Sequence, residues 1–123
     1  MKPNNHIEIP KKKLGVLMVN LGTPEKTDYI NMWKYLREFL SDKRIIELTR
    51  IFWYPILYCI ILIVRPRKSG KLYDVIWDKK KNESPLKVFT RNVTEKLQNK
   101  YNKKKVEFSY AMNYGLPRIR DEL

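Results

Sequence analysis

The chain has 123 residues, enough for one domain, and its 43% hydrophobic content with three Trp and eight Tyr excludes a disordered protein. Its net charge of +13 indicates a solvated basic surface or an acidic partner, but the lysines come as scattered triplets, so nucleic acid is not expected. The single cysteine, Cys59, excludes a disulfide framework or a metal cluster built within this chain and is typical of a reducing cytoplasm.

Residues 1–13 form a polar lead-in that contains the only histidine, His6. A lone histidine among Asn, Pro and Lys in a terminal segment is expected to be solvated and to have no chemical role. The apolar stretch that follows lacks a small-residue cleavage site, so we do not interpret it as a signal peptide.

The first predicted element is a strand over residues 14–21, because this run is almost continuously apolar, as in a strand buried on both faces. A turn at residues 22–24 follows, and then a helix capped by Thr27 and ending near Leu40. Strand, short loop and helix begin an α/β unit, in which ligands bind at the carboxyl ends of the strands.

Residues 51–64 contain no charged side chain and are followed by Arg65, Arg67 and Lys68. The run is shorter than a spanning helix needs, and three interpretations stay open: a buried core helix, a surface lying on a bilayer, and a membrane span. Pro55 fits the first turn of a helix that runs to about residue 64. The basic residues would then lie at headgroup depth or over an anionic ligand.

Beyond Arg67 the pattern predicts another helix with Leu72, Val75 and Ile76 on one apolar face, followed by a charged loop over residues 78–83. Ser84 and Pro85 predict the start of a further helix. Its expected apolar stripe is Leu86, Phe89, Val93, Leu97 and Tyr101.

The second predicted strand covers residues 106–114, and a short helix after Pro117 follows it. Five blocks of the sequence together resemble one family: VNLGTPE at 19–25, FLSDKRII at 39–46, RPRKSGKLYDVIW at 65–77, ESPL at 83–86 and AMNYGLPRI at 111–119. They resemble the amino-terminal third of a ferrochelatase of the proteobacterial type. Residues 14–123 would thus form an incomplete α/β domain with two strands and about five helices.

The resemblance implies a chelatase fold with parallel sheets flanked by helices and a porphyrin cleft between two domains. It also implies the reaction, which is insertion of ferrous iron into protoporphyrin IX to form protoheme. Iron and porphyrin are substrates, and no cofactor is implied. The implied partners are the porphyrin, the missing carboxy-terminal half of the fold and an anionic membrane surface. The implied location is the cytoplasm, peripherally on the inner membrane.

The residues that match porphyrin-contacting positions of the family are Leu21, Arg65, Tyr73, Ser84, Asn113 and Tyr114. Leu21 cannot ligate a metal, so only packing against the macrocycle is implied there. Asn113 replaces a frequent arginine, which removes a charge-assisted bond. Each match has a structural alternative: Arg65 as a surface or lipid-facing charge, Tyr73 as a core aromatic and Ser84 as a helix cap.

The apolar lip that would contact the membrane is expected to consist of Ile51, Phe52, Trp53, Leu57, Ile60 and Ile61. No metal ligand and no catalytic residue are assigned, because the family's catalytic His and Glu lie beyond Leu123. We therefore expect a fragment or a shortened gene product that is inactive alone. The alternative is a truncated, basic membrane-surface or interaction protein that has kept the fold without the chemistry.

Overall fold

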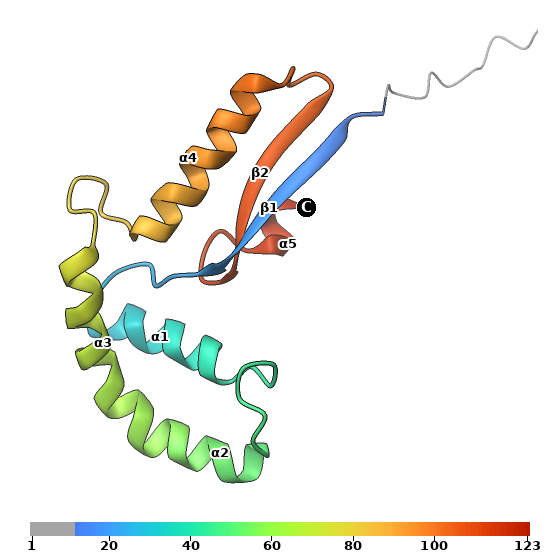
Figure 1. The fold of residues 1–123 in the computed structure, drawn as a ribbon. Helices are drawn as coiled ribbons and strands as arrows, with labels where there is room; N and C mark the ends of the chain where they lie inside the picture. The colour runs from blue at the N-terminus through green and yellow to red at the C-terminus, as the bar shows by residue number, and fades with distance from the viewer. Residues whose placement is uncertain (1–11) are drawn as a thin grey trace, which may run out of the picture.

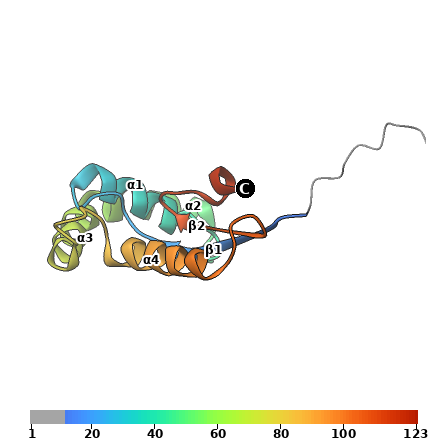
Figure 2. The same ribbon diagram turned by 90° about the horizontal axis from the view of Figure 1, so that it is seen from above.

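The computed structural model describes residues 12–123, so His6 and most of the polar lead-in lie outside the described residues. Two strands, β1 (Leu14–Gly22) and β2 (Val106–Tyr114), pair in parallel (Figure 1). Helix α4 (Pro85–Lys100) runs along one side of this sheet, and the short α5 (Ile119–Glu122) lies on the other (Figure 2). The predicted α/β class with a parallel sheet is confirmed.

The two strands lie in register over nearly their whole length, from the pair Leu14 and Val106 to the pair Gly22 and Tyr114. Their bounds agree with the prediction, except that β1 includes Gly22 as its last residue. Parallel strands need a long crossover connection, which the intervening helices supply. The carboxyl ends of both strands therefore meet at one point, beside the helical part of the molecule.

Helix α1 (Tyr29–Leu40) follows β1 as predicted, but its cap is Asp28 and not Thr27. The Asp28 carboxylate accepts a hydrogen bond from the backbone N–H of Asn31 at 3.1 Å, which satisfies one of the free donors of the first turn. Thr and Asp are both common N-cap residues, so the predicted start of the helix was wrong by one residue.

One long curved helix follows, formed by α2 (Arg50–Ile56), the π-helical segment η1 (Leu57–Ile61) and α3 (Leu62–Ile76). The predicted start at Pro55 is wrong, because this proline lies inside α2. A proline within a helix lacks the N–H for the usual bond and crowds the preceding turn. The wider π-helical turn begins two residues after Pro55, at Leu57. The predicted break at Arg67 is also wrong, since α3 continues through it.

Helix α4 begins as predicted, with the Ser84 hydroxyl accepting a bond from the backbone N–H of Lys87 at 3.2 Å. Its expected apolar stripe is only partly correct, because Phe89 is 65% exposed and Tyr101 is 52% exposed. Thr90 and Thr94 are buried against the strands instead. Each hydroxyl donates a hydrogen bond to the backbone carbonyl one turn earlier in the helix. The hydroxyls are therefore hydrogen-bonded although they are buried, so these polar residues can face the sheet.

The main core lies between α1 and the long curved helix. Its buried members are Met32, Tyr35, Leu36, Leu40, Leu57, Leu62 and Tyr114. The predicted apolar face of Leu72, Val75 and Ile76 is wrong as a buried face, because all three are exposed. Among the described residues, none of the helices combines the length and the apolar character that crossing a membrane requires.

Candidate functional site

The carboxyl ends of the two strands cross so closely that only glycine fits at two positions. Gly22 has a φ of 122°, and a Cβ there would lie 1.9 Å from the Tyr114 carbonyl oxygen. Gly115 has a φ of 89°, and its Cβ would lie 2.5 Å from the Thr23 carbonyl oxygen. The two loops that follow the strands are thus held against each other, at the edge of the sheet where α/β proteins bind ligands.

Beneath this crossing lies a cluster of aromatic rings. Tyr35 stacks on Phe39 with ring centroids 5.9 Å apart, and its edge meets Tyr73 at 6.4 Å. Phe39 in turn meets the edge of Tyr114 at 5.2 Å. Offset and edge-to-face pairs of this kind add to the stability of a core. Two predicted site residues, Tyr73 and Tyr114, are therefore joined through α1.

Burial raises the pKa of the Tyr35 hydroxyl well above its usual value, so it stays protonated. It donates to the carbonyl oxygen of Gly22 at 3.3 Å. Tyr35 therefore ties α1 to the end of β1, and its role in the site is to position the loop after the strand.

An apolar cavity of about 460 Å³ opens beside this cluster. We define the apolar cavity by its lining residues, which are Gly22, Thr23, Tyr73, Ile76, Ser84, Pro85, Leu86 and Phe89. Tyr73 and Ser84 are predicted porphyrin contacts, and the structure brings them to the same cavity. A hollow lined mainly by apolar atoms, with the hydroxyl-bearing residues Thr23, Tyr73 and Ser84 in its lining, suits an apolar ligand that carries a few polar groups.

The loop before Ser84 is fixed by a bidentate ion pair. The Arg91 guanidinium reaches the two Glu83 carboxylate oxygens at 2.9 and 2.7 Å. This hydrogen bond holds the pKa of Glu83 below its usual value. The pair anchors the end of the charged loop to α4. Ser84, at the edge of the apolar cavity, is therefore held by this ion pair next to it and by its own cap bond to Lys87.

Neither Arg65 nor Leu21 lines this cavity. Arg65, Leu72 and Ile76 share one face of α3, since residues seven and eleven apart return to the same side of a helix. All three are exposed, and Ile76 reaches the apolar cavity. Leu21 is 52% exposed at the end of β1, next to Gly22. An exposed strip therefore leads from the cavity to the Arg65 cation.

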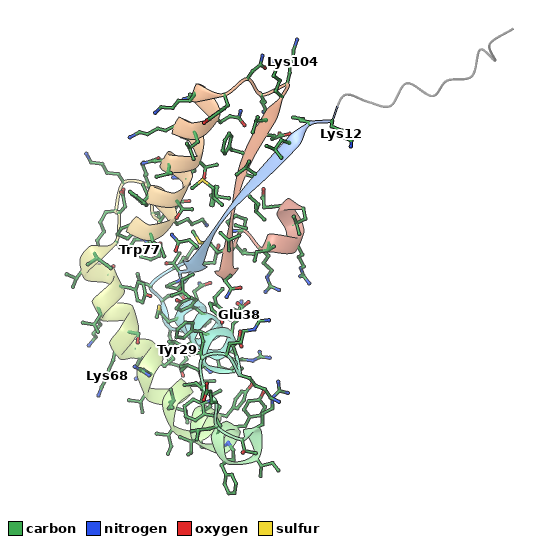
Figure 3. All side chains as sticks on the ribbon, turned by 45° about the vertical axis from the view of Figure 1, so that its right-hand side comes forward. Lys12, Tyr29, Glu38, Lys68, Trp77 and Lys104 are labelled. Carbon is green, nitrogen blue, oxygen red and sulfur yellow. The ribbon has the colours of Figure 1, made fainter. Side chains whose placement is uncertain are left out.

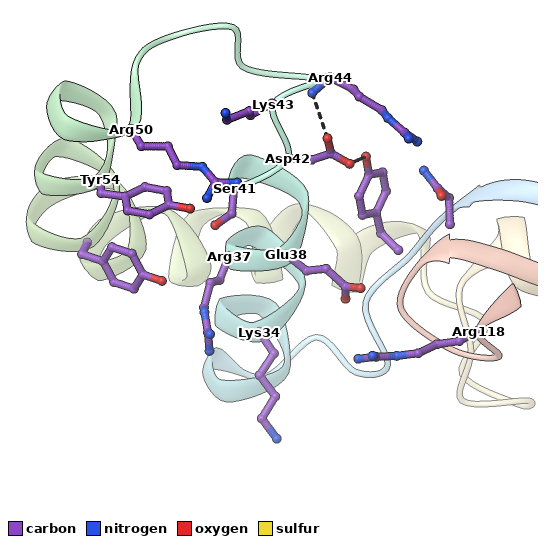
Figure 4. Close-up of a pocket in the computed structure, with 13 residues that line it drawn as sticks. Lys34, Arg37, Glu38, Ser41, Asp42, Lys43, Arg44, Arg50, Tyr54 and Arg118 are labelled. Atoms are coloured by element: carbon purple, nitrogen blue, oxygen red, sulfur yellow. Dashed lines mark hydrogen bonds between the residues drawn. The ribbon is translucent and has the colours of Figure 1, made fainter. Parts of the chain in front are cut away.

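A second, larger cavity of about 910 Å³ lies on the other side of the Tyr114 position (Figure 4). We call it the basic cavity, because its lining includes Lys34, Arg37, Lys43, Arg44, Arg50 and Arg118. Asn113 and Tyr114 also line it. Four of the six predicted porphyrin residues are thus divided between two cavities, and Leu21 and Arg65 line neither, a separation that the sequence did not indicate.

Tyr114 connects the two regions. Its ring packs on Phe39, whereas its hydroxyl donates to the Asp42 carboxylate at 2.7 Å. The backbone N–H of Arg44 donates to the other Asp42 oxygen at 2.8 Å, and this bond, followed by that from Tyr114, lowers the pKa of Asp42. Asn113 is exposed beside it.

The predicted lip residues have two different environments. Ile51, Phe52 and Ile60 are 79%, 73% and 60% exposed, in keeping with a surface role. Trp53 and Ile61 are half-buried, and the Trp53 indole N–H donates to the Leu40 carbonyl at 2.7 Å. The prediction that Leu57 belongs to the lip is wrong, because this residue is fully buried in the core and forms no part of the exposed surface. Its burial is explained by the turn of the helix, which directs this position toward α1.

Sequence reasoning did not single out Tyr35, Phe39 or Asp42 as parts of the site. Phe39 and Asp42 belong to a block used for the resemblance, so that block was the available signal. Arg37 and Arg50 carried no signal, because they line the same cavity only after residues 41–49 reverse the chain between α1 and α2 (Figure 1). Within residues 12–123 no three His, Cys, Asp or Glu side chains are grouped in a way that could hold a metal ion.

Residues 13–123 match the family model described as ferrochelatase. The chain is 51% identical over 122 residues to the ferrochelatase of Allorhizobium ampelinum and 53% identical over 118 residues to that of Chelativorans sp.. It is 56% identical over 108 residues to that of Brucella anthropi. These alignments cover 98%, 95% and 87% of this chain but 36%, 33% and 31% of the relatives, so the chain spans about a third of their length. No solved structure gives a significant match.

Proposed function

Because this chain belongs to the ferrochelatase family, we propose that it forms one wall of a porphyrin-binding cleft in an enzyme that inserts ferrous iron into protoporphyrin IX. The product of that reaction is protoheme. In this proposal the chain corresponds to the amino-terminal third of the enzyme, and the remaining two thirds of the fold supply the opposite wall.

The observation that carries the proposal is the apolar cavity bordered by Tyr73 and Ser84. The exposed strip of Leu72 and Ile76 offers an apolar bed for the macrocycle, and Arg65 stands at its far end as a cation for a propionate. A porphyrin has an apolar face and two carboxylates, so it needs this combination of surfaces. Leu21, Asn113 and Tyr114 complete the proposed contacts from the ends of the two strands.

We propose that the share of this chain in the reaction is binding and orientation of the porphyrin. Insertion of the metal requires a base that accepts the pyrrole protons, and the only histidine, His6, matches no family position. Positioning against a second wall also contributes strongly to such reactions. The 123-residue chain alone is accordingly expected to lack turnover.

We further propose that the exposed part of the lip, Ile51, Phe52 and Ile60, lies on the inner membrane from the cytoplasmic side. Arg65, Lys68 and the neighbouring basic residues would meet anionic headgroups, as long basic side chains do beside an apolar surface. Figure 3 shows Lys68 directed outward from the long helix. An apolar substrate could then be taken up directly from the bilayer.

The test of the porphyrin wall is a fluorescence titration with protoporphyrin IX of the chain and of Arg65→Ala. Loss of a charge-assisted bond is worth roughly 1.5 to 3 kcal/mol, or about tenfold or more in affinity. The matched control is Lys71→Ala, which removes the same charge from another exposed face of α3. With Zn²⁺ present, no metal insertion by the chain is expected. Equal affinities of the two variants would remove Arg65 from the site.

A further inference from the structure

The basic cavity holds an excess of positive charge that its own acids do not neutralise. Six cations and two carboxylates line it. Asp42 accepts bonds from the Tyr114 hydroxyl and the Arg44 backbone, and Glu38 accepts from the Gly115 backbone at 3.4 Å. Both acids are thus engaged with backbone or tyrosine donors.

None of the six cations forms an ion pair within the described residues 12–123, although five other ion pairs occur there. Other lysines and arginines of the described residues also form no ion pair, but these six converge on one hollow. Like charges that converge on one hollow repel each other, and a bound anion would relieve this repulsion.

Two guanidinium groups in the basic cavity are oriented by aromatic rings. The Arg37 guanidinium lies over the Trp33 ring at 5.4 Å, and that of Arg50 lies over Tyr54 at 5.8 Å. This stacking holds a planar guanidinium by its face and leaves its edge free to donate hydrogen bonds. Figure 4 shows the Arg50 side chain of α2 reaching toward Ser41 and Tyr54, and the Arg37 side chain of α1 on the Lys34 side of the cavity.

We propose that the basic cavity binds a phosphate-bearing ligand, which is either the headgroup of an anionic phospholipid or a free phosphate ester. The guanidinium groups of the arginines can each donate two parallel hydrogen bonds to a phosphate, and the lysine ammonium groups can donate single ones. The negative charge of the phosphate also matches the local excess of cations. The basic cavity shares no lining residue with the apolar cavity. Asn113 and Tyr114 line it and are also proposed porphyrin contacts, but its six cations are not, so binding of a phosphate there does not rest on porphyrin binding. Its position where α2 begins, beside exposed Ile51 and Phe52, makes a headgroup accessible from the expected membrane face.

The test is calorimetric titration of the 123-residue chain with inorganic pyrophosphate. The double variant Arg37→Gln with Arg50→Gln is expected to bind about tenfold more weakly or worse. The matched control is Lys96→Gln with Lys100→Gln on the exposed side of α4, which removes the same net charge and should change the affinity less than about twofold. Lys43→Gln, in the exposed loop, is the second variant if the arginine pair fails to fold, and it should weaken binding about threefold.

The two sources are distinguished with vesicles of phosphatidylglycerol in phosphatidylcholine. Displacement of the chain from these vesicles by pyrophosphate, together with weaker pelleting of the arginine variant, supports the headgroup. Pyrophosphate binding that leaves pelleting unchanged supports a free phosphate ester. Equal weakening in the arginine and lysine double variants, no saturable binding, or displacement of pyrophosphate by protoporphyrin would each overturn the proposal.

Discussion

The apolar cavity and the basic cavity lie on two sides of the same crossing of strand ends, but different parts of the chain determine them. The apolar cavity is formed by the crossing backbone at Gly22 and by the anchored start of α4 at Ser84. The basic cavity is formed mainly by long side chains of α1, α2 and the loop between them, together with Asn113, Tyr114 and Arg118 at the end of β2 and after it. The apolar cavity depends on backbone geometry and the basic cavity on side-chain charge. Substitutions at the first should therefore change mainly the free energy of unfolding, and substitutions at the second mainly the binding of anions.

The largest effect is expected from Gly22→Ala. The added Cβ would meet the Tyr114 carbonyl at 1.9 Å in a backbone conformation that alanine rarely adopts. We expect a loss of about 4 kcal/mol or more in the free energy of unfolding, or failure to fold. Urea denaturation measures it. Gly15→Ala is the control, since its Cβ would meet nothing within 4 Å, and equal losses in both variants would contradict the close crossing.

The next effect separates the core from the exposed lip. Leu57→Ala removes a fully buried side chain and should cost about 2 to 5 kcal/mol in the free energy of unfolding. Ile60→Ala changes a side chain that is 60% exposed and should cost well under about 1 kcal/mol.

Binding to vesicles, measured by pelleting, should be affected in the opposite order, more by Ile60→Ala than by Leu57→Ala. At a temperature where both variants are folded, Ile60→Ala is expected to reduce binding to phosphatidylglycerol vesicles, whereas Leu57→Ala is not. If Leu57→Ala instead weakened pelleting without changing stability, the assignment of Leu57 to the core would be wrong.

The bounds of the two strands were well predicted from the sequence because their signals are local. The expected burial of the first strand on both faces is wrong, because Leu14, Val19 and Leu21 are exposed. A continuous apolar run followed by Gly, Thr and Pro indicated the first strand, residues 106–114 were recognised as the second, and the Ser84 and Pro85 pair indicated the start of α4. The long helix was poorly predicted, because proline is read locally as a start or a break. Tertiary packing of Leu57 and Leu62 against α1 keeps the helix continuous through Pro55.

The site itself was only partly predictable for a related reason. The family resemblance supplied Tyr73, Ser84 and Tyr114, and the fold brings Tyr73 and Tyr114 together through rings of α1 that no periodicity had marked. The basic cavity had no sequence signal, because in a chain with a net charge of +13 any arginine looks like any other. Its members converge only where the chain reverses between α1 and α2 and where the end of β2 brings Tyr114 and Arg118 to the same place.

The smallest effect distinguishes the two roles of Ser84. Ser84→Ala removes the acceptor for the Lys87 N–H, so we expect a loss of about 1 kcal/mol in the free energy of unfolding. Ser84→Asn is the matched variant, because asparagine caps helices as well as serine does and should restore most of this stability.

Protoporphyrin titration of the same two variants tests the second role. The Ser84 oxygen accepts a hydrogen bond from the Lys87 N–H, so its own O–H remains free to donate. Only 2% of the residue is exposed to solvent. If Ser84 acts only as a cap, Ser84→Asn should recover both stability and porphyrin affinity. If its hydroxyl also contacts the porphyrin, Ser84→Asn should recover stability and still bind porphyrin several-fold more weakly. We expect the second result, because Ser84 borders the apolar cavity together with Tyr73.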